Sequence, residues 1–201
     1  MNSASPAPHT DVRANILATG QRIMAGKGYS AVGLTEILTA AGVPKGSFYH
    51  YFGSKDAFGE AMLQTYFDDY LAEIDRTMAA PGQTMAQRLM AYWDAWRSAQ
   101  SFQDCQGKCL AVKLGAEVAD LSEAMRRVLQ GGTDGIVARL AAAIAAGVEE
   151  GSLAIDGDAM AVAQSLYQLW LGASIMVKIG RSTQPFDTAL AMTRQILHLT
   201  A

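Results

Sequence analysis

Apolar residues recur along most of the chain at the three- and four-residue spacing of helices. In residues 11–27 they fall at Val12, Ile16, Ile23 and Met24, with small residues between them. Half of the 201 residues are hydrophobic, alanine is abundant, and only five prolines interrupt the pattern. Alternating runs of β-branched residues are few. The pattern predicts an all-α protein without a sheet and with enough apolar residues for a substantial core.

Two short helices follow the first one. Residues 34–41 form an amphipathic stretch that is broken by Gly42, Val43 and Pro44, and residues 45–52 form a second, shorter stretch. Gly53 then ends it, and Ser54 is a suitable cap for a long fourth helix reaching to about residue 78. Two short helices joined by a few residues that include glycine are typical of a helix-turn-helix.

Charge is unevenly distributed along the chain. The net charge is −3, yet residues 1–55 carry five cations against two carboxylates, so that residues 56–201 hold the negative excess. This asymmetry indicates a basic module that meets a polyanion, joined to an acidic module with another task.

The second helix of such a unit lies in the major groove of DNA, with its N-terminal residues at the base edges. Lys45 offers a cation, Gly46 permits close approach, and Ser47 adds a hydroxyl. Phe48 and Phe52 are four residues apart and should pack inward, which turns the two residues after Phe48 outward. Among the residues expected to contact phosphates or bases are therefore Lys45, Gly46, Ser47, Tyr49, His50 and Lys55.

The run ILTAAGVPKGSFYHYFGSKDAFGEAM closely resembles the helix-turn-helix of the TetR family of bacterial repressors. The resemblance implies a homodimer on a palindromic DNA operator, and it adds Thr35 to the DNA contacts. It also implies three parts: a disordered tail at 1–9, a helix-turn-helix domain at 10–55, and a helical effector-sensing and dimerisation domain at 56–201. Gly33 departs from the Ser or Thr that caps the second helix in many members, so we expect a weaker cap there.

The acidic remainder predicts further helices at 85–99, 122–130 and 136–147, one from 159, and one at 185–199, and we expect about nine helices in the whole chain. Five aromatic residues fall at helical spacing in this region. Ordinary core packing and a pocket for a hydrophobic inducer are both open interpretations of these residues, which are Tyr92, Trp93, Trp96, Tyr167 and Trp170.

Residues 159–177 contain no charge, which approaches the length of a membrane span. Polar residues spread along the run, such as Gln164 and Gln168, favour a buried helix, and we expect no membrane contact. Its apolar surface suggests that a second subunit covers part of it. By resemblance, the last two helices form the dimer interface, for which we expect Leu166, Trp170, Ala173 and Ile196.

Two cysteines lie close together, at 105 and 109. If a helix starts near Gly107, Cys109 sits in its first turn, where the helix dipole and nearby Lys113 would lower the pKa of the thiol. The alternative is that Cys109 is a small core residue, as free cysteines often are.

The stretches KCLAVKLGAEVADLSEAM and YQLWLGASIMVKIGRS are similar to those of an electrophile-responsive branch of the same family. This resemblance implies that Cys109 senses electrophiles or oxidants with help from Lys178, and that its modification releases DNA and induces detoxification genes. Cys105 is close enough to be a resolving partner, but its role stays open.

Catalytic machinery is not evident. The three histidines are far apart in the chain, which argues against a cysteine–histidine pair and against a metal site, and no phosphate-binding glycine loop occurs. We expect no cofactor, and a cytoplasmic location because the first residues lack a signal peptide. The leading hypothesis is a DNA-binding repressor; the alternative is a helical small-molecule-binding protein or thiol enzyme without a DNA function.

Overall fold

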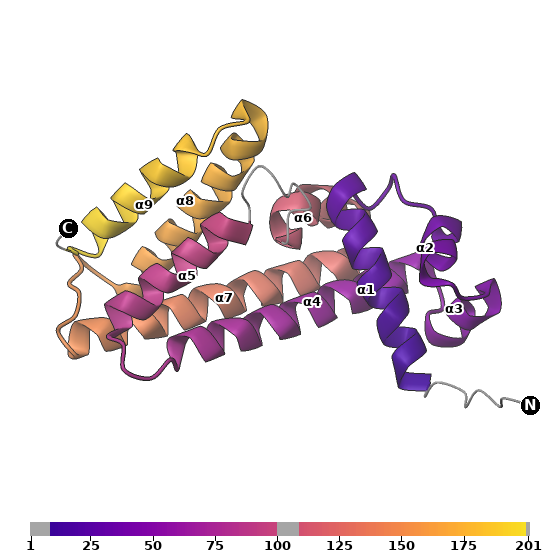
Figure 1. Ribbon diagram of the computed structural model, residues 1–201, viewed down its shortest axis with the longest axis horizontal. Helices are drawn as coiled ribbons and strands as arrows, with labels where there is room; N and C mark the ends of the chain where they lie inside the picture. The colour runs from indigo at the N-terminus through magenta and orange to yellow at the C-terminus, as the bar shows by residue number, and fades with distance from the viewer. Residues whose placement is uncertain (1–8, 100–108, 200–201) are drawn as a thin grey trace, which may run out of the picture.

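The computed structural model describes residues 9–99 and 109–199, and this part of the chain consists of nine helices and no strand (Figure 1). The all-α prediction is confirmed. Residues 1–8 of the expected tail lie outside the described residues, and His9 already belongs to the first helix. The helices are α1 (His9–Lys27), α2 (Leu34–Ala41), α3 (Lys45–Tyr51), α4 (Lys55–Met78), α5 (Met85–Ala99), α6 (Leu110–Leu121), α7 (Glu123–Glu149), α8 (Ala159–Gly180) and α9 (Gln184–Ile196).

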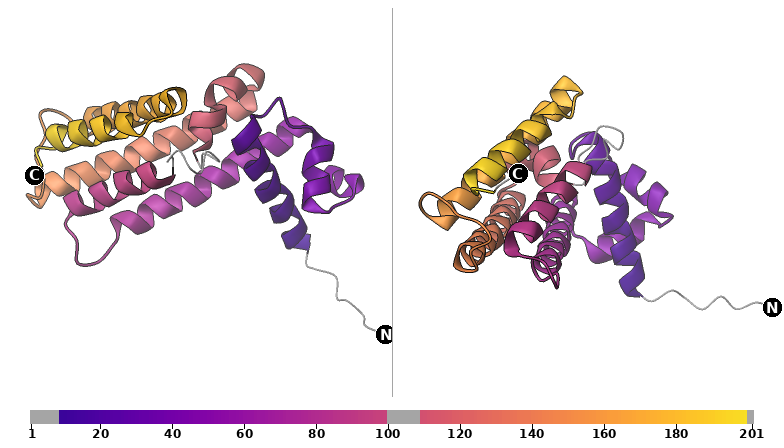
Figure 2. Two further views of the ribbon diagram at one scale, coloured as in Figure 1. Left: turned by 45° about the horizontal axis from the view of Figure 1, so that its top comes forward. Right: turned by 60° about the vertical axis from the view of Figure 1, so that its left-hand side comes forward.

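The helices are arranged around two long members, α4 and α7, which run side by side through the molecule (Figure 1). Helices α1, α2 and α3 pack at one end, whereas α8 and α9 form an antiparallel pair towards the other, as both views of Figure 2 show. The short helix α6 contacts α7 and also α1. Helix α6 therefore bridges the larger helical part and the three N-terminal helices.

Both ends of α2 and the start of α4 lie where the sequence predicts them. Gly42 ends α2 in the left-handed conformation (φ 68°), and Val43 N–H donates to the carbonyl of Leu38. Ser54 caps α4 by accepting from the amide of Ala57 at 3.1 Å. Gly33 precedes α2 without a side-chain cap, as expected.

Helix α7 corrects one prediction. Instead of two helices at 122–130 and 136–147, the structure has one continuous helix across the glycine-rich run. The glycines serve close packing: a Cβ at Gly132 would lie 2.2 Å from the ring of Phe67, and one at Gly135 would lie 3.1 Å from Leu71, both on α4. Thus these two glycines allow α4 and α7 to approach each other and do not break the helix.

Helices α7 and α8 are long and apolar enough, by length and composition alone, to cross a membrane. In the structure both pack against other helices of the chain, α7 against α4 and α8, and α8 against α7 and α9. The core helix of a folded domain has the same composition, and this is the role that both helices have here.

The residues expected at the dimer interface are placed differently from the prediction. Leu166, Trp170 and Ala173 are buried within the chain, and Ile196 is half-buried. Trp170 stacks on Trp93 with ring centroids 4.8 Å apart, so its ring is part of the chain's own core. The large apolar side chains that α8 and α9 leave exposed are Met160, Ile175, Met176, Ile179 and Met192.

Candidate functional site

Helix α3 presents one packed face and one open face. Phe48 and Phe52 are buried, as predicted, and their rings contact each other and Phe58 of α4 at centroid distances of 5.2–5.6 Å. Arg13 of α1 lies over the ring of Phe52, 5.5 Å from its centroid. The aromatic residues therefore fix α3 against α1 and α4, while Lys45, Gly46 and Tyr49 of α3 stay exposed.

The open face carries most of the residues expected to contact DNA. Lys45, Gly46, Tyr49 and His50 are exposed, with 54% of Tyr49 accessible, and Ser47 is half-buried. On α2, Thr35 is exposed as well. No heavy atom lies within 4 Å of the position that a Cβ of Gly46 would take. The packing of the chain therefore does not require a glycine there, and close approach of DNA at Gly46 stays a prediction.

Lys55 has a role within the chain that the sequence did not predict. Its ammonium donates to the carbonyl of Tyr29 at 2.9 Å and lies 4.5 Å from the centroid of the Tyr29 ring. The hydroxyl of Tyr29 donates to Asp56 at 3.0 Å. Tyr29 therefore ties the loop between α1 and α2 to the first turn of α4, and the DNA contact of Lys55 stays a prediction.

Glu117 of α6 holds the same loop from the other side. Its carboxylate accepts from the amide of Ser30 at 2.7 Å and from the amide of Tyr29 at 3.0 Å. Gly28 lies against this carboxylate in the left-handed conformation (φ 95°), where a Cβ would be 3.0 Å from the Glu117 oxygen. Burial acts to raise the pKa of Glu117, but hydrogen bonds from Ser30 and Tyr29, with Lys113 nearby, lower it overall.

A pocket of about 650 Å³ opens between α1, α4, α5 and the start of α6. Its walls are largely aromatic, and Tyr66 and Tyr70 of α4 are stacked with ring centroids 5.9 Å apart. Asp69 and Glu73 also line the pocket and give it two carboxylates. The lining residues important for its chemistry are Tyr66, Asp69, Tyr70, Glu73, Tyr92, Trp96 and Cys109.

Cys109 is the thiol of this pocket, and it is buried. It directly precedes α6, so the helix begins at Leu110 and not near Gly107 as expected. Burial raises the pKa of the thiol, although hydrogen bonds from the amides of Val112 and Ala111 and from Tyr66, with the charge of Lys178, oppose this. The predicted lowering is therefore wrong in sign, because desolvation outweighs the helix N-terminus.

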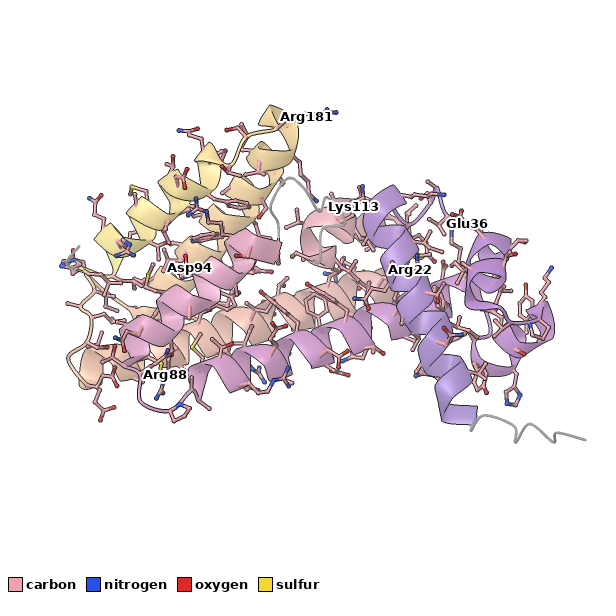
Figure 3. The ribbon with its side chains drawn as sticks, in the orientation of Figure 1. Arg22, Glu36, Arg88, Asp94, Lys113 and Arg181 are labelled. Atoms are coloured by element: carbon pink, nitrogen blue, oxygen red, sulfur yellow. The ribbon has the colours of Figure 1, made fainter. Side chains whose placement is uncertain are left out.

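The cation beside the thiol also differs from the expectation based on sequence position. Lys178 of α8 acts on Cys109, whereas Lys113, labelled in Figure 3 on α6, lies near Glu117. The pairing of Cys109 with Lys178 agrees with the resemblance-based prediction for these two residues. Cys105 lies outside the described residues.

Four tyrosines surround the thiol site, and only Tyr92 and Tyr167 were expected there from the sequence. The hydroxyl of Tyr66 acts to lower the pKa of the Cys109 thiol, and the hydroxyls of Tyr70 and Tyr92 bond to each other at 3.1 Å. Tyr167 is buried, and its ring contacts Trp96 edge to face at 5.8 Å. Tyr66 and Tyr70 were missed, although their four-residue spacing on a long helix was a usable signal.

Of the five aromatic residues considered for an inducer pocket, Tyr92 and Trp96 line the cavity, and their role in binding an inducer stays a prediction. Trp93 and Trp170 belong to the core, where Trp170 also stacks on Phe186 at 5.8 Å and donates to Thr193 at 2.9 Å. For these two tryptophans ordinary core packing was the correct alternative.

An all-α chain with a helix-turn-helix at one end and a pocket in its larger helical part has the architecture of a one-component DNA-binding regulator. Two family models match it: "Bacterial regulatory proteins, tetR family" over residues 16–62, and "Tetracyclin repressor-like, C-terminal domain" over residues 86–193. The chain belongs to the TetR family, whose members are DNA-binding repressors that act as dimers, and it is a regulator and not an enzyme.

Individual relatives are similar over nearly the whole chain. The HTH-type transcriptional repressor NemR of Escherichia coli K12 is 41% identical over 191 residues, covering 93% of this chain and 94% of that protein. The crystal structure of reduced E. coli NemR matches with a TM-score of 0.89 over 95% of this chain and 99% of that one. The repressor DhaR of Mycobacterium sp. GP1 is 33% identical over 188 residues, 94% of this chain and 93% of that protein.

Proposed function

We propose that this repressor is switched by its thiol: electrophiles or oxidants modify Cys109, and the modified protein leaves its operator and allows detoxification genes to be expressed. The observation that carries the proposal is that one short helix, α6, joins the two sites. Cys109 precedes its first residue, and Glu117, two turns along, accepts from the loop between α1 and α2.

The DNA side of the proposal rests on the open face of α3. A homodimer places two copies of α3 in successive major grooves of a palindromic operator, about 34–36 Å apart. The contacts proposed are those of Thr35, Lys45, Gly46, Ser47, Tyr49, His50 and Lys55. The dimer interface is proposed on α8 and α9, over the exposed side chains Met160, Ile175, Met176, Ile179 and Met192.

The switch follows from the packing around Cys109. The thiol is buried beside Tyr66 and under the influence of Lys178. An added group must occupy the pocket or displace the first turn of α6 because interiors are closely packed. A displaced α6 carries Glu117 with it, and the loop that Glu117 holds is attached to α1 and α4. Coupling between two such sites typically amounts to about 1–3 kcal/mol, or roughly 5- to 150-fold in affinity.

The test is fluorescence anisotropy of the full chain on DNA from its own upstream region, with and without N-ethylmaleimide. We expect tight binding by the reduced parent, loss of binding after the reagent, and retained binding by Cys109→Ser. Cys105→Ser is the matched control, since it removes the other thiol and should respond as the parent does if Cys109 is the sensor.

Other outcomes separate the alternatives. If Cys109→Ser releases DNA on treatment as the parent does, Cys109 is not the sensor, and Cys105 or a noncovalent inducer in the pocket becomes the better account. If Lys178→Gln leaves the response unchanged, Lys178 has no part in the switch. If the chain binds small molecules but no DNA, the result would support the alternative function, a helical small-molecule-binding protein.

A further inference from the structure

One wall of the pocket between α1, α4, α5 and the start of α6 is a single stripe of α4. Tyr66, Asp69, Tyr70 and Glu73 follow one another at the three- and four-residue spacing of one helix face, and all four line the cavity. Aromatic rings and carboxylates therefore alternate along this wall. One compound in the pocket can meet both kinds of group at once.

The two carboxylates have no partner within the part of the chain that the structure describes. Neither Asp69 nor Glu73 forms an ion pair or a side-chain hydrogen bond there, and both side chains are exposed. The described lining residues include no Lys, Arg or His. Lys178 acts on the Cys109 thiol from α8, but it is not a lining residue. The described wall of the pocket thus carries negative charge that no lining cation balances.

The aromatic side chains of the pocket offer π faces to a ligand. The rings of Tyr66 and Tyr70 are stacked with an interplanar angle of 9°, and Tyr92 contacts Trp96 edge to face with ring centroids 6.1 Å apart. All four residues line the cavity. The face of an aromatic ring is negative, so it attracts a cation within about 6 Å of the ring centroid. The rings and the carboxylates therefore favour the same sign of charge in a ligand.

The hydroxyls of Tyr70 and Tyr92 add hydrogen-bond acceptors. They share one bond of 3.1 Å, and each oxygen keeps a lone pair. Burial raises the pKa of Tyr70, and the nearby Cys109 and Glu73 add to this effect, so the hydroxyl is neutral at pH 7. A neutral phenol oxygen accepts a hydrogen bond from an ammonium N–H. Acceptors, π faces and carboxylates together fit an amine that is protonated and attached to an aromatic ring system.

We propose that this pocket binds protonated aromatic amines as noncovalent ligands, with the ring system against the aromatic side chains and the ammonium group at Asp69 and Glu73. Binding is reversible and involves no reaction of Cys109, so the inference goes beyond the thiol switch and does not depend on it. Because Cys109 lines the same pocket, a bound amine covers the thiol and competes with the reagents that modify it.

The experiment compares three fluorescent compounds that share one ring system and differ in charge. Pyrenemethylammonium is a cation, pyrenemethanol is neutral, and pyrenecarboxylate is an anion. Each is titrated with the reduced full chain at pH 7 and low salt, and binding is followed by the change in pyrene fluorescence. We expect the cation to bind about fivefold more tightly than the alcohol, because an exposed charge pair contributes up to a few-fold in affinity and the pocket supplies two carboxylates. The anion should bind more weakly than the alcohol.

The double variant Asp69→Asn and Glu73→Gln removes both charges from the pocket. The affinity of the cation should fall to about that of the alcohol, whereas the affinity of the alcohol should stay within about twofold of its value in the parent. Asp68→Asn is the matched control, because Asp68 is the neighbouring residue on α4, is exposed, and does not line the pocket. It should leave all three affinities unchanged. The three side chains are exposed, so these variants should fold as the parent does.

Tyr70→Leu tests the aromatic wall. It replaces a stacked ring by an apolar side chain without a π face, so the cation should lose more affinity than the alcohol. A uniform effect of long-range charge on the cation would not be sensitive to this change. The two sets of variants therefore examine the charge and the location of the ligand separately.

Four outcomes would overturn the inference: binding of the cation no tighter than that of the alcohol, a preference for the cation that persists in the double variant, an unchanged affinity for the cation in Tyr70→Leu, or no binding of any of the three compounds. None of these results bears on the thiol switch, because alkylation of Cys109 and release of DNA are measured without an amine. Conversely, a repressor that ignores N-ethylmaleimide can still bind the cation.

Discussion

Glu117 accepts a 2.7 Å hydrogen bond from the amide of Ser30, a residue 87 positions earlier in the chain. With the 3.0 Å bond from the amide of Tyr29, this contact fixes α6 to the loop that precedes α2. The same loop is held to α4 through Tyr29, Lys55 and Asp56. The helix that follows the thiol is thereby connected to the helices that read DNA.

Loss of this carboxylate should weaken the coupling between the two sites. In Glu117→Gln an amide N–H₂ can face the backbone amides, so at least one of the two hydrogen bonds is lost. We expect the reduced variant to bind DNA with an affinity within a few-fold of that of the parent. The factor by which N-ethylmaleimide weakens DNA binding should be at least about fivefold smaller in the variant, because couplings of this kind correspond to roughly 5- to 150-fold in affinity. Anisotropy titrations before and after alkylation measure the ratio of the two DNA affinities for each variant.

Asp120→Asn is the matched control, because it removes one carboxylate from an exposed position of the same helix. It should leave the ratio unchanged. A full response in Glu117→Gln would show that the signal reaches α3 by another route.

The same carboxylate predicts a dependence of stability on pH. The folded protein holds the pKa of Glu117 below its ordinary value of 4.5, so the contact contributes stability that is present above that value and is lost as the pH falls through the folded pKa. Glu117→Gln should therefore be less stable than the parent near pH 7 by about 1.5 kcal/mol, the lower end of the range for hydrogen bonds to a charged group, because Glu117 is only half-buried. The difference should narrow as the pH falls below about 4.5. Urea unfolding at several pH values tests this, and a difference that is constant with pH would contradict it.

Lys45 should contribute to DNA affinity mainly through charge. If it contacts a phosphate, Lys45→Ala lowers the slope of log K against log salt by about 0.9 per subunit, or roughly 2 per dimer, and weakens operator and unrelated DNA alike. A larger loss on the operator alone would indicate a base contact instead. Arg127→Ala, the same charge change on α7, should alter neither affinity nor slope.

The substitution Gly46→Ala should raise the stability of the fold and lower the affinity for DNA. Nothing lies within 4 Å of its missing Cβ, so Gly46→Ala should stabilise the folded chain by up to about 1 kcal/mol through the helix propensity of alanine. If DNA approaches this position closely, the added methyl group weakens operator binding. Gly26→Ala in α1 is also unhindered and should stabilise the fold without changing DNA affinity. If Gly46→Ala binds the operator as tightly as the parent, DNA does not approach Gly46 closely.

Helix ends and inward-facing aromatic residues depend on local chemistry, whereas the environment of the thiol does not. Gly42, Ser54 and the pair Phe48 and Phe52 were interpreted correctly, because turns, caps and inward-facing aromatics are determined by residues a few positions apart. The predicted direction of the pKa shift at Cys109 was wrong because the shift depends mainly on burial of the thiol, which the residues next to it in the sequence do not reveal.

The surroundings of the thiol were hard to predict for the same reason. The contact of Tyr66 with Cys109 spans 43 positions, and that of Glu117 with Ser30 spans 87. The placement of Leu166, Trp170 and Ala173 shows a related limit: the apolar character of α8 was evident, but which of its faces meets its own chain depends on packing against α7 and α9.

The glycines of α7 provide a last test, on the contact that joins the two long helices. Gly132 is buried with its Cβ position 2.2 Å from the Phe67 ring, whereas Gly131, its neighbour in the same helix, is exposed and has open space. Gly132→Ala must displace Phe67 or separate α4 from α7, so we expect a loss of about 1–3 kcal/mol in the free energy of unfolding. Gly131→Ala should gain up to about 1 kcal/mol, because it adds helix propensity at no steric cost. Urea denaturation of the two variants measures both, and equal effects would mean that α4 and α7 are not in close contact at Gly132.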